Sequence, residues 1–154
     1  MPQLRHQGKF VFGWSVIRED NSFSIPPQTV EEYKLSEQSC LILFTSSKIS
    51  GGFCITGVEK LKHSKLSKIL ENNPELEAEE ANEKIIDYKG KSYCRIKMMD
   101  ACHIQLTEEI KNHFNVKCGD KLLVIRGSNI AFDCLAKGPL LEVANDSDKK
   151  IEIF

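Results

Sequence analysis

Six cysteines and four histidines are among the residues of this 154-residue chain that could ligate a metal or act as nucleophiles. No two of the cysteines form the Cys-x-x-Cys pair that is common in zinc sites, since they stand at Cys40, Cys54, Cys94, Cys102, Cys118 and Cys134. Most lie among Leu, Ile, Phe or Val, where a reduced cysteine acts as a small buried hydrophobe. We therefore expect structural thiols and no metal site.

Cys102 and His103 are adjacent in the sequence and could form a nucleophile and its base. Neighbours on a strand point to opposite faces, and we predict a short strand over 102–104, so the two side chains should point apart. The chain has no G-x-G-x-x-G, Walker or G-x-S-x-G motif. The Gly51-Gly52 step lacks the following Lys and helix of a phosphate cradle. We predict that the protein is not an enzyme and uses no cofactor.

Composition bounds the remaining function classes. The net charge is −1, with 21 Lys and Arg against 22 Asp and Glu, whereas nucleic-acid binders usually carry a basic excess. Hydrophobic residues make up 41% and charged residues 28% of the chain, which is ordinary for a folded protein. No apolar run approaches the roughly 20 residues of a membrane span, and the N-terminus lacks the apolar core of a signal peptide. We expect a cytoplasmic protein with no membrane contact.

The elements that must position these residues are mainly strands with a few short helices, an α+β class. Alternating or β-branched runs predict strands over 9–17, 23–25, 40–45, 91–99, 102–104, 121–125, 130–135 and 140–143. Short helices begin near Gln28 and after Thr107, which can cap one. Between 58 and 86 the composition shifts to Lys, Glu, Leu and Ala, which favours helix. This helical connector is either a solvated link or a docking surface for a protein partner.

The order of elements occurs twice along the chain. Three pairs of matching residues are each 81 positions apart: Leu35 and Val116, Leu41 and Leu122, Ile49 and Ile130. Ile25 and Ile104 match at 79 positions, and Gly8-Lys9 and Gly90-Lys91 match at 82, which indicates small insertions. The pattern predicts two copies of one supersecondary unit that bury a core together.

In the second copy, Ile104 is followed by a predicted helix that starts with acidic residues, and then by a turn, a strand, a hairpin and a second strand. The turn and the start of the strand have the sequence Val116-Lys117-Cys118-Gly119-Asp120-Lys121-Leu122. In the first copy, the step before the helix is Ile25-Pro26. This order resembles the AbrB/SpoVT swapped-hairpin family, in which two chains interlock hairpins to form one barrel. The resemblance implies an intrachain pseudo-dimer with units at 8–56 and 90–144, a helical connector at 57–89 and a tail at 145–154. Such a chain is complete as a monomer or pairs again as a homodimer.

The resemblance also implies a DNA-binding transcriptional regulator, with double-stranded DNA as the partner. The family's basic helix positions fall near Val30-Glu31 and at Lys111-Asn112, and among these only Lys111 is basic. The nucleic-acid contacts that we predict are Arg18, Arg95, Lys97, Lys111 and Arg126. Because the usual arginines are mostly absent, the alternative is a module that keeps the barrel and binds a protein partner or a small ligand.

Overall fold

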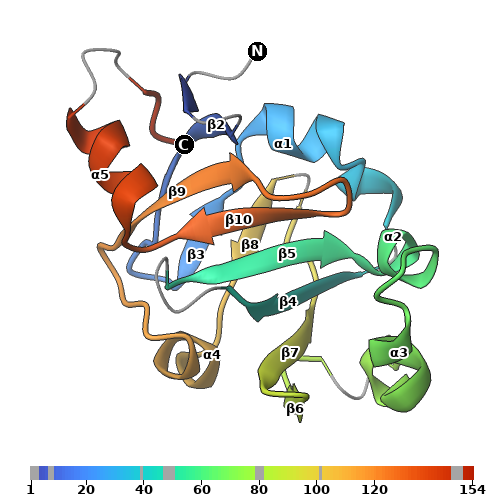
Figure 1. Ribbon diagram of the computed structural model, residues 1–154. Helices are drawn as coiled ribbons and strands as arrows, with labels where there is room; N and C mark the ends of the chain where they lie inside the picture. Colours follow the sequence, from blue (N-terminus) through green and yellow to red (C-terminus); the bar gives the residue numbers. More distant parts are fainter. Residues whose placement is uncertain are drawn as a thin grey trace.

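The computed structural model describes residues 4–6, 9–38, 40–46, 51–78, 82–100, 102–146 and 151–154 (Figure 1). The first half contains β1 (Leu4–His6), β2 (Lys9–Val16), β3 (Ser22–Ser24), α1 (Pro27–Glu32), the 3-10 turn η1 (Leu35–Glu37), β4 (Leu41–Thr45) and β5 (Phe53–Gly57). The connector contains α2 (Val58–Lys62), α3 (Lys68–Asn72) and the 3-10 turn η2 (Pro74–Glu77). The second half contains β6 (Ile85–Tyr88), β7 (Lys91–Ile96), β8 (His103–Gln105), α4 (Glu108–His113), β9 (Lys121–Arg126), β10 (Ala131–Leu135) and α5 (Pro139–Asp146).

The two halves exchange strands within one curved sheet. Its eight strands follow the order β1-β2-β9-β10-β5-β4-β7-β6, all neighbours are antiparallel, and β3 and β8 form a separate two-stranded ribbon. Thus β2 of the first half pairs with β9 of the second, and β7 of the second pairs with β4 of the first. Equivalent strands follow one another in the same order from either end of the sheet. The α+β prediction is confirmed, and among the described strands the sheet stays open between β1 and β6.

Two equivalent hydrogen bonds fix the alignment of the halves. The Ile25 amide donates to the Cys102 carbonyl at 2.7 Å, and the Leu106 amide donates to the Asn21 carbonyl at 2.9 Å. Ile25 therefore corresponds to Leu106, so the match of Ile25 with Ile104 is wrong by two residues; Ile104 lies opposite Phe23 in the ribbon. Helices α1 and α4 begin 81 positions apart, as the predicted repeat requires.

A bulge accounts for the longer offset upstream. The register between β2 and β9 shifts between Val11 and Gly13, which adds one residue to β2 relative to β7. An offset of 82 before this point and 81 after it follows from that single insertion. Of the predicted matches, Ile49 and Gly8 lie outside the described residues.

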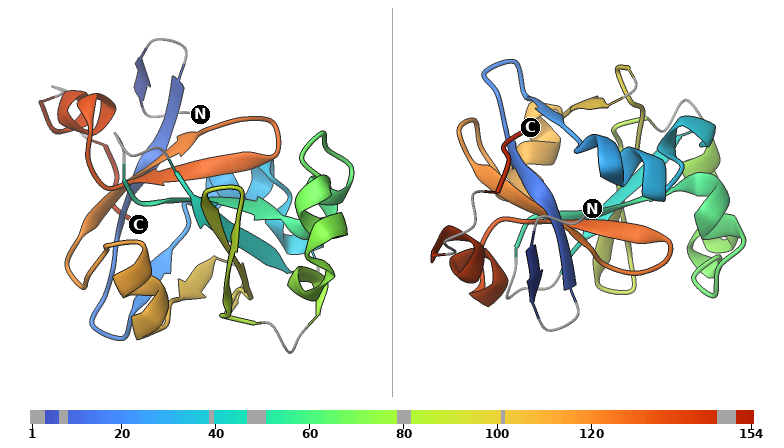
Figure 2. Two further views of the ribbon diagram at one scale, coloured as in Figure 1. Left: turned by 60° about the horizontal axis from the view of Figure 1, so that its bottom comes forward. Right: turned by 90° about the horizontal axis from the view of Figure 1, so that it is seen from above.

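Strand alternation separates one central core from two outer layers. Inward residues such as Leu43, Phe53, Cys94, Leu122 and Phe132 meet in the central core. On the outer faces, α5 covers a cluster around Trp14, and the connector covers a cluster around Ile42. These two coverings lie at opposite ends of the molecule (Figure 2).

The end of the chain differs from its sequence prediction. The strand predicted over 140–143 is wrong, because this segment is part of α5, whose Leu140, Leu141 and Ala144 pack on the Trp14 cluster. Beyond it, Ile153 forms a parallel bridge with Trp14. Among the described residues, none of the helices combines the length and the apolar character that crossing a membrane requires.

Gly52 and Gly90 give a matched test of the packing between β5 and β10. Both have positive φ, +64° and +81°, but an added Cβ would lie 2.0 Å from the Cys134 carbonyl oxygen at Gly52 and would meet nothing within 4 Å at Gly90. We expect Gly90→Ala to lower the free energy of unfolding by about 1 kcal/mol, from backbone strain alone. Gly52→Ala should cost about 3 kcal/mol or more, because the backbone must also shift. Urea unfolding measures both values, and equal losses would contradict this packing.

Candidate functional site

Arg95, a predicted nucleic-acid contact, is only 5% exposed. Alternation along β7 places it on the outer face with Tyr93, the face that the connector covers. Its Nε and Nη1 atoms have no hydrogen-bond partner among the described residues. Burial raises the pKa of the nearby Cys40, and the Arg95 guanidinium offsets part of that rise. The predicted contact at Arg95 is therefore buried beneath the connector.

Lys111 is also 5% exposed and joins the two halves. Its Nζ donates to Asn21 Oδ1 at 2.6 Å and to Cys118 Sγ at 3.4 Å, and it pairs with Glu108 at 3.2 Å. Burial lowers the pKa of Lys111, but the bonds to Glu108 and Cys118 outweigh burial and raise it. The ammonium is thus charged and engaged in bonds within the protein.

The other three predicted contacts lie at the surface or near it. Arg126 forms an ion pair with Glu32 and donates from Nη2 to Asn129 at 3.0 Å. Arg18 is exposed and donates from Nη2 to Ser24 Oγ at 2.6 Å; Lys97 is exposed on the segment after β7. The structure therefore brings no cluster of the five together on one described surface. Their roles in DNA contact stay predictions.

The connector leaves a groove against β6 and β7 that sequence reasoning did not identify. Its volume is about 360 Å³, within the range of ligand-binding pockets. The floor is apolar and aromatic: Leu61 and Ile69 come from the connector, and Phe44, Tyr88 and Tyr93 come from the sheet. Phe44 and Tyr93 stack with ring centroids 5.7 Å apart, and Tyr88 meets Tyr93 edge-on at 6.5 Å. The Tyr88 hydroxyl accepts a bond of 2.7 Å from Asn72, which fixes that wall to α3.

Four lysines form the rim of this groove: Lys65, Lys68, Lys89 and Lys91. All four are exposed, and none forms an ion pair with a residue that the structure describes. Among the described residues that line the groove, none is Asp or Glu. Lys89 Nζ lies 5.4 Å from the centre of the Tyr88 ring, a cation–π distance. Beside the rim, Leu66 is 58% exposed. A ligand in this groove would therefore make apolar contacts with the floor and meet positive charge at the rim.

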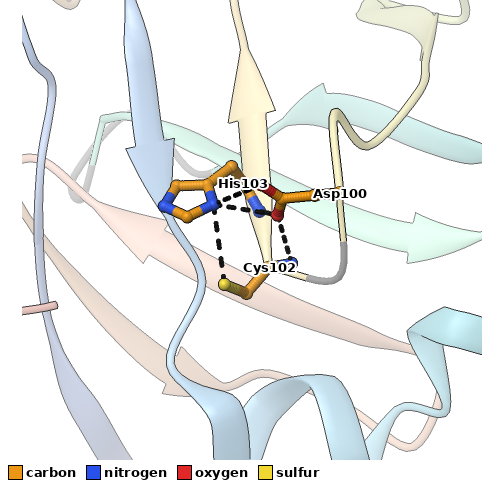
Figure 3. Close-up of side chains that lie close together, drawn as sticks. All are labelled: Asp100, Cys102 and His103. Carbon is orange, nitrogen blue, oxygen red and sulfur yellow. Dashed lines mark hydrogen bonds and ion pairs between the residues drawn. The ribbon is translucent and has the colours of Figure 1, made fainter.

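Cys102 and His103 do not point apart as predicted (Figure 3). Strand β8 begins only at His103, so the alternation of a strand does not apply to Cys102, and Sγ lies 3.6 Å from His103 Nδ1. The same Nδ1 lies 2.8 Å and 2.9 Å from the two Asp100 carboxylate oxygens. A nucleophile–His–Asp relay uses the two ring nitrogens separately, so this arrangement does not form one.

The structure confirms the prediction of buried thiols for four of the six cysteines. All six are free, and Cys40, Cys54, Cys94 and Cys134 are buried. Burial raises the pKa of Cys94 to about 12, and burial also raises that of Cys134. These thiols are therefore protonated and unreactive at neutral pH.

Comparison with known proteins assigns no family: no protein-family model, curated protein or solved structure matches the chain. No role is therefore transferred from a relative, and the function must follow from the residues of this chain. Two features remain after the predicted contacts are placed. They are the lysine-rimmed groove and the cluster of Asp100, Cys102 and His103.

Lys111→Ala and Lys117→Ala test whether Lys111 stabilises the fold. Lys111 bonds across the halves, whereas Lys117 is exposed on the following turn. Removing Lys111 takes away the ammonium that bonds both Asn21 and Glu108, so we expect the melting temperature to fall by several degrees. Lys117→Ala should leave it nearly unchanged. Thermal unfolding followed by circular dichroism compares the two, and equal melting temperatures would assign Lys111 a surface role instead.

Proposed function

We propose that this chain is a swapped-hairpin pseudo-dimer that works as a non-catalytic binding module, and that it binds an acidic segment of a partner protein in the connector groove. The groove with its aromatic floor and four exposed rim lysines is the observation that carries the proposal. The repeated order of elements and the exchange of β2 and β7 between halves support the swapped-hairpin assignment.

An acidic peptide matches both parts of the groove. Its carboxylates complement the rim, where each exposed pair contributes about 0–1 kcal/mol and mainly steers association. An apolar side chain between them can bury itself against Tyr93 and Leu66, which contributes about 1.5–3 kcal/mol. The apolar contact therefore provides most of the affinity, and the lysines provide the preference for an acidic partner.

A DNA-binding regulator is the function that the family resemblance implies, and the charge distribution supports it less. Arg95 and Lys111 are used inside the protein, and Arg126 is paired with Glu32. The exposed Arg18 stands beside Glu19 and Asp20, so the field of this loop is not strongly positive. A duplex could contact the rim lysines, but its phosphates would gain nothing from the aromatic floor.

Two substitutions in the groove separate these functions. A short fluorescent peptide rich in Glu and Asp with central Phe residues serves as one probe, and a mixed-sequence DNA duplex serves as the other. Lys68→Glu should weaken any anionic ligand, whereas Leu66→Ser removes apolar contact without changing charge. We expect fluorescence anisotropy to show peptide binding that Leu66→Ser weakens about tenfold.

Lys117→Glu, an equal charge change outside the groove, is the matched control and should leave peptide binding nearly unchanged. Salt should weaken peptide binding only partly, because the apolar contact is not screened. Duplex binding that falls steeply with salt and ignores Leu66→Ser would contradict the proposal and support the regulator. No peptide binding by the folded protein would also contradict it.

A further inference from the structure

The turn between β7 and β8 gathers three different metal-ligating groups. Asp100, Cys102 and His103 each place one donor atom within 4.8 Å of the others (Figure 3). Carboxylate, thiolate and imidazole are all common zinc ligands. This set contains no Cys-x-x-Cys pair, since its spacing is Asp-x-Cys-His.

The distance between the sulfur and nitrogen donors equals that of a tetrahedral zinc site, and the nitrogen and oxygen donors lie closer together than in such a site. Bond lengths of about 2.3 Å to sulfur and about 2.0–2.1 Å to nitrogen place the two donors about 3.6 Å apart at a tetrahedral angle. The observed distance from Cys102 Sγ to His103 Nδ1 is 3.6 Å. The same geometry requires about 3.4 Å between nitrogen and carboxylate oxygen. Asp100 Oδ2 lies 2.9 Å from Nδ1, so a small side-chain rotation would open the site.

The backbone holds the three residues in place. The Met99 amide donates to the His103 carbonyl at 2.8 Å, and the Ile25 amide donates to the Cys102 carbonyl at 2.7 Å. Asp100 Oδ1 accepts bonds from the Cys102 and His103 amides at 2.9 Å and 3.0 Å. Oδ1 is thus engaged in the turn, and Oδ2 can serve as the ligand.

The turn does not require the thiol or the imidazole. The equivalent loop of the first half forms the same closing bond, from the Arg18 amide to the Ser22 carbonyl at 2.8 Å. In that loop Glu19, Asn21 and Ser22 stand where the second half has Asp100, Cys102 and His103. One half therefore makes the turn without a thiol or an imidazole.

We propose that Asp100, Cys102 and His103 form a three-ligand site for a transition-metal ion such as Zn²⁺, with a fourth position open to solvent. Asp100 is exposed and Cys102 and His103 are half-buried, so solvent can reach the cluster and supply a water at the fourth position. On binding, Cys102 forms a sulfur–metal bond and its thiol proton passes to solvent. The groove and this site share no lining residue, so each can fail independently of the other.

Cobalt titration tests the site directly. The reduced full-length chain, without a polyhistidine tag and freed of metal by a chelator, is titrated with Co²⁺ and then with Zn²⁺. We expect one Co²⁺ per chain, a near-ultraviolet thiolate-to-cobalt band and visible bands of tetrahedral intensity, all displaced by Zn²⁺. Cys102→Ser should abolish the thiolate band, and His103→Ala and Asp100→Asn should each weaken binding at least tenfold.

Cys118→Ser and His63→Ala are the matched controls, since both residues are exposed and lie outside the cluster. Each should bind Co²⁺ as the unchanged protein does, and circular dichroism checks that every variant is folded. Asp100→Asn keeps an oxygen for the turn, so its effect reports ligation more than folding. A missing thiolate band in the folded protein, or a band that survives Cys102→Ser, would overturn the proposal.

Discussion

The exchange of strands between the halves is the constraint on which the rest of this structure depends. Strand β2 pairs with β9 of the other half, and β7 pairs with β4 of the other half. Neither half alone can therefore form all the backbone hydrogen bonds of its strands. The central pairing of β5 with β10 then closes the core from both sides. The same exchange brings Asn21 of one half to Lys111 of the other, which places a positive charge inside the protein.

A nearly symmetric frame carries different residues at equivalent positions, and the candidate sites lie where the halves differ. Trp14 and Arg95 correspond, since each is bridged in parallel by the chain that follows the last hairpin strand, at Ile153 and Asn82. Trp14 packs in an apolar layer beneath α5. On the Arg95 side the larger connector covers the sheet and leaves the groove at its margin. The metal-ligating cluster likewise occupies only one of two equivalent turns.

Local patterns predicted much of the frame. The match of Leu41 with Leu122 and the helix start at Thr107 follow from alternation and capping, which act over a few residues; the Thr107 hydroxyl accepts a bond of 3.1 Å from the Ile110 amide. Predictions that depended on how helices pack on the outer faces of the sheet were less successful. The sequence around Arg95 suggests an exposed side chain, but the connector packs over it and buries it. No local pattern specifies that packing. The Leu140 to Val143 segment could form a strand or a helix, and its packing on Trp14 favours the helix.

Native-state hydrogen exchange across the four exchanged strands measures the interdependence of the halves most directly. If the halves fold only together, the slowest amides of β2, β4, β7 and β9 should open with the same free energy, that of global unfolding. Amides such as those of Leu43 and Leu123, in different halves, should then respond equally to added denaturant. Exchange from β2 and β4 at a clearly lower free energy than from β7 and β9 would show that the halves open separately, and would contradict their interdependence.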